Sequence, residues 1–182
     1  MDGPLWVFGY GSLIWDPGFP VARTLKARLD GWRRSFCMSS IHYRGSVDLP
    51  GLVLALDRAE GAHCEGVAFE VAPGAEAETL AVLRERELIS RAYLECRLPV
   101  RLTTADEVEA LVYVIDRDHV QYCGGLDLEA QARSIAAACG DRGPNRDYLF
   151  NTADHLDRLG IRDADLAWLA ARVRALSNGS EG

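Results

Sequence analysis

The amino-acid sequence predicts an α+β fold, and the order of its segments leads to this class. Short apolar segments typical of strands dominate the chain up to Ile115, and a single segment rich in helix-forming residues interrupts them. The periodicity changes to that of helices from Asp127 onward. Strands followed by a group of helices indicate α+β architecture rather than a doubly wound parallel sheet. The 182 residues suit one domain, which we place at residues 1–177, followed by a frayed polar tail at residues 178–182.

The predicted strands begin with Leu5–Phe8, an apolar run that enters a glycine-containing loop. A turn-rich stretch at residues 44–51 separates the second strand from the third. In the fourth, Val67, Phe69 and Val71 lie on one side. The strands expected after the first are Arg33–Ser39, Leu52–Leu56, Cys64–Val71, Tyr93–Leu102 and Glu109–Ile115.

Four helices are predicted from composition and spacing. The first runs from Ala75 to about Ile89, after the break at Pro73-Gly74, and is rich in Glu, Ala, Leu and Arg. The second is stopped by Gly140, the third follows Pro144 with Asn145 as its expected cap, and the fourth precedes the tail. Apolar residues recur at three- and four-residue steps in the second helix (Leu128, Ala132, Ile135, Cys139) and in the fourth (Leu166, Leu169, Val173, Leu176).

Composition and charge exclude several classes of protein. No apolar run approaches the ~20 residues of a membrane helix, and no secretory signal is visible, so we expect a cytoplasmic protein. The net charge of −7 and the lack of a basic run argue against nucleic acid as a partner. The five cysteines form no C-x-x-C and the four histidines no H-E-x-x-H, so we expect reduced thiols and no metal site.

The stretch from Val7 to Trp15 is the most unusual part of the sequence. It lacks the third glycine of a dinucleotide fingerprint, because Ile14 stands there, and no Gly-Lys-Ser/Thr follows for a phosphate loop. Ser12 also lacks the flanking glycines of a nucleophile elbow. What remains is a strand that enters a tight turn of small residues. Such a turn can hold a carboxylate or a developing oxyanion on its N–H groups, or it can simply reverse the chain.

Four ordered blocks resemble the ChaC branch of the gamma-glutamylcyclotransferases. The first is GYGSLIW, starting at Gly9, and the second pairs Arg44-Gly45 with Pro50-Gly51. The third is Arg86-Glu87 followed by Tyr93-Leu94, and the last pairs Gly143-Pro144-Asn145 with Tyr148-Leu149-Phe150. The family often has arginine directly after the second block, where this chain has Leu52, so that position receives no ligand role. The resemblance implies a mixed, curved or barrel-like sheet with surrounding helices.

The resemblance also implies a reaction. Enzymes of this branch cleave glutathione: the glutamyl α-amine attacks the γ-carbonyl of the same molecule, which releases 5-oxoproline and cysteinylglycine. No cofactor, metal, nucleic acid or membrane is implied, and the chain is expected as a monomer or weak homodimer. Two alternatives stay open, namely a cyclotransferase for other γ-glutamyl amines or amino acids and a catalytically silent small-molecule binding module.

The family pattern places the catalytic carboxylate at Glu87. Helical spacing puts Glu87 on one face with Leu80 and Leu83, where apolar neighbours would favour the protonated form that a general base must reach. The competing interpretation is a solvated ion pair with Arg84 or Arg91, three and four residues away. Glu85 is the other candidate, but two residues of helix turn it about 200° away.

The residues expected to bind substrate are assigned by the same resemblance. Arg44 could meet a substrate carboxylate or stabilise its own turn, and Tyr93 could bond the substrate or be an ordinary half-buried strand residue. The full predicted set is Gly9, Tyr10, Gly11, Ser12, Leu13, Arg44 and Tyr93.

Overall fold

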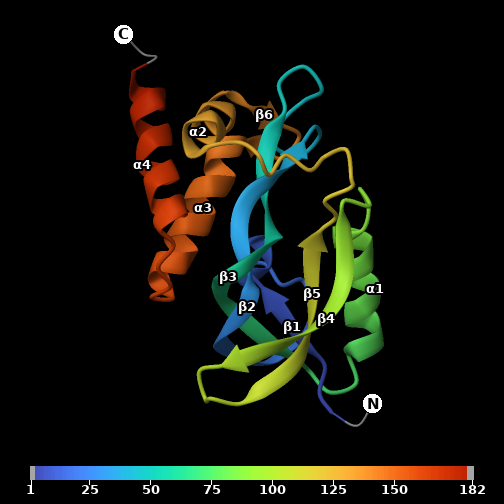
Figure 1. Ribbon diagram of the computed structural model, residues 1–182. Helices are drawn as coiled ribbons and strands as arrows, with labels where there is room; N and C mark the ends of the chain where they lie inside the picture. Colours follow the sequence, from blue (N-terminus) through green and yellow to red (C-terminus); the bar gives the residue numbers. More distant parts are fainter. Residues whose placement is uncertain (1–2, 180–182) are drawn as a thin grey trace. The chain divides into compact units, whose positions relative to one another are not determined.

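The computed structural model describes residues 3–179 and confirms the α+β class with a barrel-like sheet. Five strands close in the order β1-β3-β2-β4-β5 (Figure 1). Antiparallel pairing joins β1 to β3, β2 to β4 and β4 to β5, and the parallel pairing of β1 with β5 closes the ring. The bounds of these strands are β1 Trp6–Gly9, β2 Val21–Ser40, β3 Gly51–Val71, β4 Tyr93–Leu102 and β5 Glu107–Ile115.

Two of these strands are far longer than the sequence pattern indicated. The predicted segments at 52–56 and 64–71 are parts of β3, and the predicted segment at 33–39 is only the end of β2. The first part of β2 alternates less clearly because several of its side chains are exposed. Local periodicity therefore marked the buried portions of these strands and missed the portions in which only one face meets the core.

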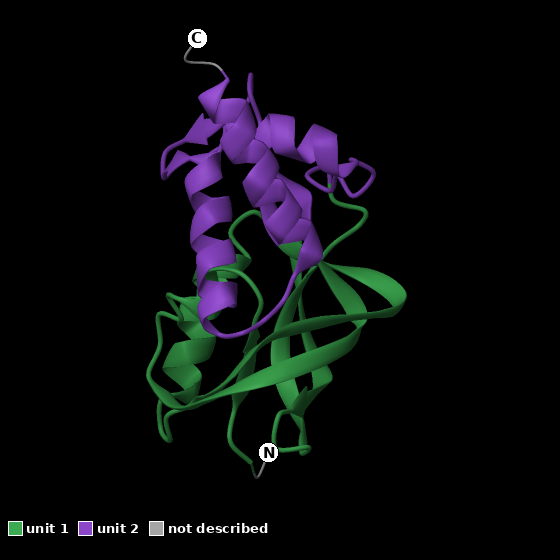
Figure 2. Ribbon diagram, turned by 90° about the vertical axis from the view of Figure 1, so that its left-hand side faces the viewer, with its two compact units in different colours: residues 1–34, 55–119 green, residues 35–54, 120–182 purple. Residues whose placement is uncertain are grey.

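The described residues fall into two compact units, shown in different colours in Figure 2. The first unit comprises residues 1–34 and 55–119, and the second comprises residues 35–54 and 120–182. Each unit is assembled from separate stretches of the chain, and β2 and β3 contribute residues to both. The single domain at residues 1–177 stays a prediction.

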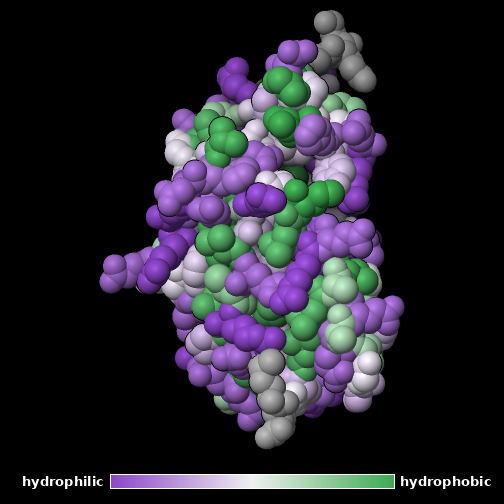
Figure 3. All heavy atoms as spheres, turned by 90° about the vertical axis from the view of Figure 1, so that its right-hand side faces the viewer, coloured by the Kyte–Doolittle hydropathy of each residue, from purple (hydrophilic) through white to green (hydrophobic). Residues whose placement is uncertain are grey.

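The first unit holds most of the barrel, the short 3-10 helix η1 (Ser12–Ile14) and helix α1 (Glu76–Glu87). Val7 and Phe8 of β1 are completely buried, as is Leu83 of α1. The predicted helix at 75–89 is slightly shorter than expected, because it ends at Glu87 and Leu88 caps it. On the face drawn in Figure 3, hydrophilic and hydrophobic residues are interspersed.

The second unit holds three helices, α2 (Leu128–Ala137), α3 (Asn145–Arg158) and α4 (Ala164–Asn178). Helix α2 ends earlier than predicted because β6 (Cys139–Gly140) pairs with β7 (Gly143–Pro144). Asp127 and Asp163 cap α2 and α4 through their side chains. Of the predicted frayed tail, Asn178 belongs to α4, whereas residues 180–182 lie outside the described residues.

The expectation that Asn145 caps the third helix is wrong. Asn145 is the first residue of α3 and is completely buried, and no side-chain bond caps this helix. Its Oδ1 accepts from the Leu52 N–H at 2.7 Å, and its Nδ2 donates to the Leu52 carbonyl at 2.7 Å. The amide therefore imitates one residue of a neighbouring strand, a role that no local pattern reveals.

Candidate active site

The glycine loop follows the end of β1 in the first unit. Close packing requires glycine at its first position, because a Cβ on Gly9 would lie 2.9 Å from a ring carbon of Phe69 and 3.2 Å from Cβ of Leu13. The carbonyl of Gly11 accepts from the Ile14 N–H at 3.0 Å, and the carbonyl of Ser12 accepts from the Asp16 N–H at 3.0 Å. These bonds tighten the chain into η1 directly after the strand.

The carbonyls of Gly11 and Ser12 have donors, but three consecutive N–H groups of the loop have no acceptor among residues 3–179. Within residues 3–179, the main-chain N–H groups of Gly11, Ser12 and Leu13 have no hydrogen-bond acceptor. Gly11 and Leu13 are buried residues. The three residues form the N-cap and the first turn of η1, where the helix itself supplies no acceptor for the N–H groups. The arrangement suits a bound oxyanion or carbonyl oxygen, which is one of the two alternatives for this turn, and substrate binding at the loop stays a prediction.

Tyr10 and Tyr93 have clear structural surroundings. The Tyr10 hydroxyl donates to the main-chain carbonyl of Tyr113 at 2.9 Å, and Tyr10 is buried. Tyr93 is the first residue of β4, is partly buried and lies opposite Ile115 of β5. Their predicted contacts with substrate stay predictions, and for Tyr10 the main chain is better placed for that role than the phenol.

Glu87 is the last residue of α1, and its side chain is only 15% exposed. Arg86 links it to the glycine loop. The Arg86 Nη2 donates to Ser12 Oγ at 3.0 Å and Nη1 donates to the Asp16 carbonyl at 2.6 Å, while Nε lies 3.3 Å from Glu87 Oε1. One guanidinium thus contacts both the loop and the predicted base.

The competing interpretation of Glu87 as a solvated helix ion pair has no support. Arg84 pairs with Glu95 instead, at 2.7 and 2.9 Å. Arg91 lies outside the helix with a φ of 57°, and no ion pair joins it to Glu87 within the described part of the chain. Glu85, the alternative carboxylate, is exposed.

A polar network that the sequence analysis missed lies beside Glu87. The Tyr113 hydroxyl donates to Glu95 Oε2 at 3.1 Å, and Arg84 holds both oxygens of the same carboxylate. Burial, followed by the nearby charges of Glu95 and Glu87, raises the pKa of Tyr113. The hydrogen bond from Arg84 lowers the pKa of Glu95. Alternation along β4 places Glu95 on the same face as Tyr93, which was the only signal in the sequence for its position.

Arg44 belongs to the second unit and is engaged with its own surroundings. Its Nη1 donates to the carbonyls of Arg142 at 2.7 Å and Pro144 at 3.3 Å, and the guanidinium lies 5.6 Å from the ring centre of Tyr148. Burial lowers the pKa of Arg44. These contacts favour the alternative in which Arg44 stabilises its turn, and its contact with substrate stays a prediction.

Two further properties concern the described residues as a whole. Within residues 3–179, no group of three His, Cys, Asp or Glu side chains could hold a metal ion. No helix in the same range combines the length and apolar character needed to cross a bilayer.

The fold is shared with solved structures of gamma-glutamyl cyclotransferases. A crystal structure of a gamma-glutamyl cyclotransferase specific to glutathione from yeast superimposes with a TM-score of 0.85 at 22% identity, over 96% of this chain and 97% of that one. A further structure described as a gamma-glutamyl cyclotransferase gives 0.59 at 15% identity.

Sequence comparison identifies the family. The family model described as "ChaC-like protein" matches residues 5–176. The glutathione-specific gamma-glutamylcyclotransferase of Escherichia coli (strain K12) is 35% identical, over 96% of this chain and 75% of its own length. Gamma-glutamylcyclotransferase 2-3 of Arabidopsis thaliana is also 35% identical, over 97% and 92% respectively. The chain belongs to the ChaC-like family.

Proposed function

We propose that this protein cleaves glutathione to 5-oxoproline and cysteinylglycine, with Glu87 as the catalytic residue. The observation that carries the proposal is the contact between the glycine loop and the end of α1. The Arg86 guanidinium donates to Ser12 of the loop and lies 3.3 Å from the Glu87 carboxylate. Three N–H groups of the same loop have no acceptor among residues 3–179. The names of the relatives from Escherichia coli and Schizosaccharomyces pombe, both glutathione-specific gamma-glutamylcyclotransferases, support glutathione as the substrate.

The reaction needs little from the protein besides geometry and proton transfer. The α-amine and the γ-carbonyl belong to one molecule, so attack closes a five-membered ring without a second reactant. Well-oriented intramolecular reactions gain on the order of 7–11 kcal/mol from this arrangement. Free glutathione contains the same two groups, so the site contributes by holding the glutamyl chain in the folded conformation in which they react.

Glu87 transfers a proton from the α-ammonium to the leaving amine. Its carboxylate removes a proton from the α-ammonium, and the freed amine then forms the C–N bond at the carbon of the γ-carbonyl group. When the tetrahedral intermediate collapses, the bond to the cysteinyl nitrogen breaks and Glu87 returns its proton to that leaving amine. The ring nitrogen then loses its second proton, which the released amine takes up, so the lactam keeps one N–H. No water is consumed, and the carboxylate is regenerated, as general acid–base catalysis requires.

The loop N–H groups stabilise the γ-carbonyl oxygen of the substrate. As the amine attacks, the γ-carbonyl oxygen acquires negative charge, and N–H groups that are already oriented stabilise this charge without reorganisation. The main-chain N–H groups of Gly11, Ser12 and Leu13, which have no acceptor among the described residues, are the proposed donors. Glu87 would supply the proton transfer and the loop N–H groups would stabilise the oxyanion. We therefore expect turnover to survive exhaustive chelation of metal ions.

The remaining expectations belong to the same proposal. We expect a monomer or weak homodimer that works in the cytoplasm, with the small-molecule substrate as its partner and no role for nucleic acid or membrane. A wider substrate range is the second candidate. Other γ-glutamyl amines present the same reacting atoms, and the name of the Arabidopsis relative specifies the γ-glutamyl group without naming glutathione.

The test is a product assay with the purified full chain. Glutathione and several γ-glutamyl dipeptides are incubated separately in ¹⁸O-labelled water, and 5-oxoproline and the released amine are quantified by mass spectrometry. We expect equal amounts of 5-oxoproline and cysteinylglycine from glutathione, with no ¹⁸O in the 5-oxoproline. Release of ¹⁸O-labelled glutamate would indicate a hydrolase, and binding without turnover would indicate the silent module. Either result overturns the proposal, whereas equal turnover of the dipeptides favours the wider substrate range.

A further inference from the structure

A nearly buried arginine contacts the main chain of the glycine loop. Arg34 of β2 is only 7% exposed. Its Nε donates to the carbonyl of Tyr10 at 2.7 Å, and its Nη2 donates to the carbonyl of Glu65 in β3. Burying a guanidinium is costly unless hydrogen bonds satisfy its N–H groups, and these two bonds fix Arg34 to the main chain of the loop and of β3.

The register of β1 and β3 shows what Arg34 interrupts. The ladder runs from Trp6 opposite Glu70 to Gly9 opposite Val67. In an antiparallel ladder, pairs that exchange hydrogen bonds alternate with pairs that do not. The Val71 N–H donates to the Leu5 carbonyl at 2.9 Å, so Leu5 and every second residue after it belong to hydrogen-bonded pairs.

Continuation of this register would pair Gly11 with Glu65. The Gly11 N–H would then donate to the Glu65 carbonyl, and the Glu65 N–H to the Gly11 carbonyl. In the structure both carbonyls have other donors, because Arg34 reaches the Glu65 carbonyl and the Ile14 N–H reaches the Gly11 carbonyl. The Cys64 thiol also approaches the Glu65 carbonyl, at 3.6 Å. The guanidinium stands where the ladder would have continued.

The bond to Tyr10 orients the peptide that carries the Gly11 N–H. In a planar trans peptide, the carbonyl oxygen of one residue and the N–H of the next point in opposite directions. The Tyr10 carbonyl points at Arg34, so the Gly11 N–H points away from it. This agrees with the lack of an acceptor for that group among residues 3–179.

We infer that Arg34 is a positioning residue that ends the β1–β3 ladder and thereby frees the Gly11 N–H to stabilise the oxyanion. The inference rests on the proposed function, since it assigns to Gly11 the substrate's γ-carbonyl oxygen. Arg34 acts through the Tyr10–Gly11 peptide and touches no reacting atom.

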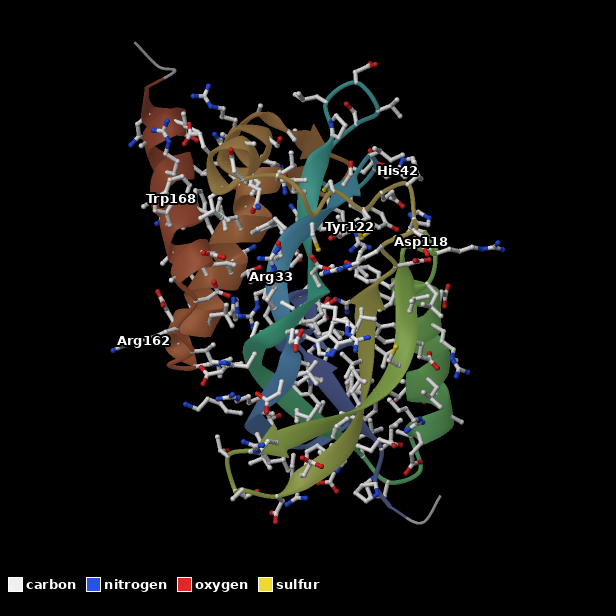
Figure 4. All side chains as sticks on the ribbon, viewed as in Figure 1. Arg33, His42, Asp118, Tyr122, Arg162 and Trp168 are labelled. Carbon is white, nitrogen blue, oxygen red and sulfur yellow. The ribbon has the colours of Figure 1, made fainter. Side chains whose placement is uncertain are left out.

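The test compares Arg34 with its neighbour on the same strand. Arg33, labelled in Figure 4, has a side chain that is 51% exposed and lies 3.9 Å from Asp57. Arg34→Lys keeps the charge but replaces the separate Nε and Nη2 donors of the planar guanidinium by a single nitrogen, and Arg34→Met keeps the bulk. Arg33→Lys and Arg33→Met are the matched controls. For folded Arg34 variants we expect kcat to fall by about 10²- to 10³-fold, as for loss of one oxyanion donor, with KM changed by less than about threefold. Arg33 variants should keep kcat.

An amide measurement separates this role from a merely structural one. In Arg34→Met the Gly11 N–H is released to bond with the Glu65 carbonyl, so its hydrogen exchange should slow and its proton resonance should move downfield. In the wild-type protein the same resonance should shift when 5-oxoproline is added.

The inference is overturned if folded Arg34 variants behave like the Arg33 controls. If the variants do not fold, the wild-type measurement decides, and a Gly11 amide that is protected from exchange and unmoved by 5-oxoproline refutes the inference. Failure of the proposed function would be visible separately, as wild-type protein that makes no 5-oxoproline. The exchange comparison at Gly11 would still report whether Arg34 ends the ladder.

Discussion

Replacing Glu87 by glutamine changes the predicted base with the least disturbance to its surroundings. The substitution preserves the size of the side chain and an oxygen that can accept from Arg86, but the amide cannot take up the proton of the α-ammonium. We expect Glu87→Gln to fold normally, to retain binding of glutathione, and to lose turnover.

The size of the loss follows from the role of the carboxylate. A positioned general base contributes roughly 10²- to 10⁴-fold, which corresponds to about 3–5 kcal/mol of barrier height. The structural loss is far smaller. The Arg86–Glu87 contact of 3.3 Å joins adjacent residues on the helix, and its removal should cost no more than about 1 kcal/mol. Against a typical unfolding free energy of about 5–15 kcal/mol, such a loss leaves nearly every molecule folded.

The assay measures 5-oxoproline release at saturating glutathione, with the thermal midpoint recorded for each variant. Glu85→Gln is the matched control, because it makes the same chemical change two residues earlier on α1 at an exposed position. We expect this control to stay within about twofold of wild type. Equal activity of the two variants would refute the assignment of Glu87 and favour the silent binding module.

Three further predictions concern the loop, its link to α1 and the second unit. Gly11→Val should abolish measurable turnover without unfolding the protein, because a β-branched side chain crowds the N–H donors; normal turnover would show that the loop does not hold the substrate. Arg86→Met should lower kcat by about 10²-fold, the usual cost of a small misplacement, and Arg86→Lys should recover part of it; equal kcat in both variants and wild type would contradict the role of Arg86. The hydrogen bond from Arg172 lowers the pKa of Glu129 to about 2 from an ordinary value near 4.5. A depressed folded-state pKa stabilises the fold above the unfolded pKa, so the difference in urea midpoint between wild type and Glu129→Gln should be complete above about pH 5 and disappear as the pH falls toward 2. A difference independent of pH would be inconsistent with this ion pair.

Much of the candidate site could be predicted because its parts lie in short, continuous segments. The glycine loop is a local turn directly after a strand, and Glu87 sits in a block that resembles a known family. The dinucleotide fingerprint and the phosphate loop could be excluded in the same way, since a missing third glycine or a missing lysine is visible within a few residues. Helical spacing alone could not choose between Glu87 and an ion pair, because spacing says which residues share a face and not what that face meets.

The predictions that failed, or were never made, depend on residues that are distant in sequence. Asn145 read locally as a helix cap, yet its amide pairs with Leu52, 93 residues away. Arg84 was a candidate partner for Glu87 at three residues, but it binds Glu95 on β4. In both cases the side chain has several possible partners, and it forms hydrogen bonds with a strand that is distant in sequence and close only in the folded protein.

The sequence by itself therefore determined the order of strands and helices, the residue types at the loop and at the predicted base, and the family. These properties follow from the local preferences of the backbone and from which side chains are present. The tertiary structure alone decided that Arg86 reaches Ser12 across 74 residues and that Arg34 meets the carbonyl of Tyr10 across 24. The physical reason is that closing the sheet into a barrel sets the register of strands far apart in the chain. That register, rather than any local pattern, selects which main-chain groups are paired and which are left available to a substrate.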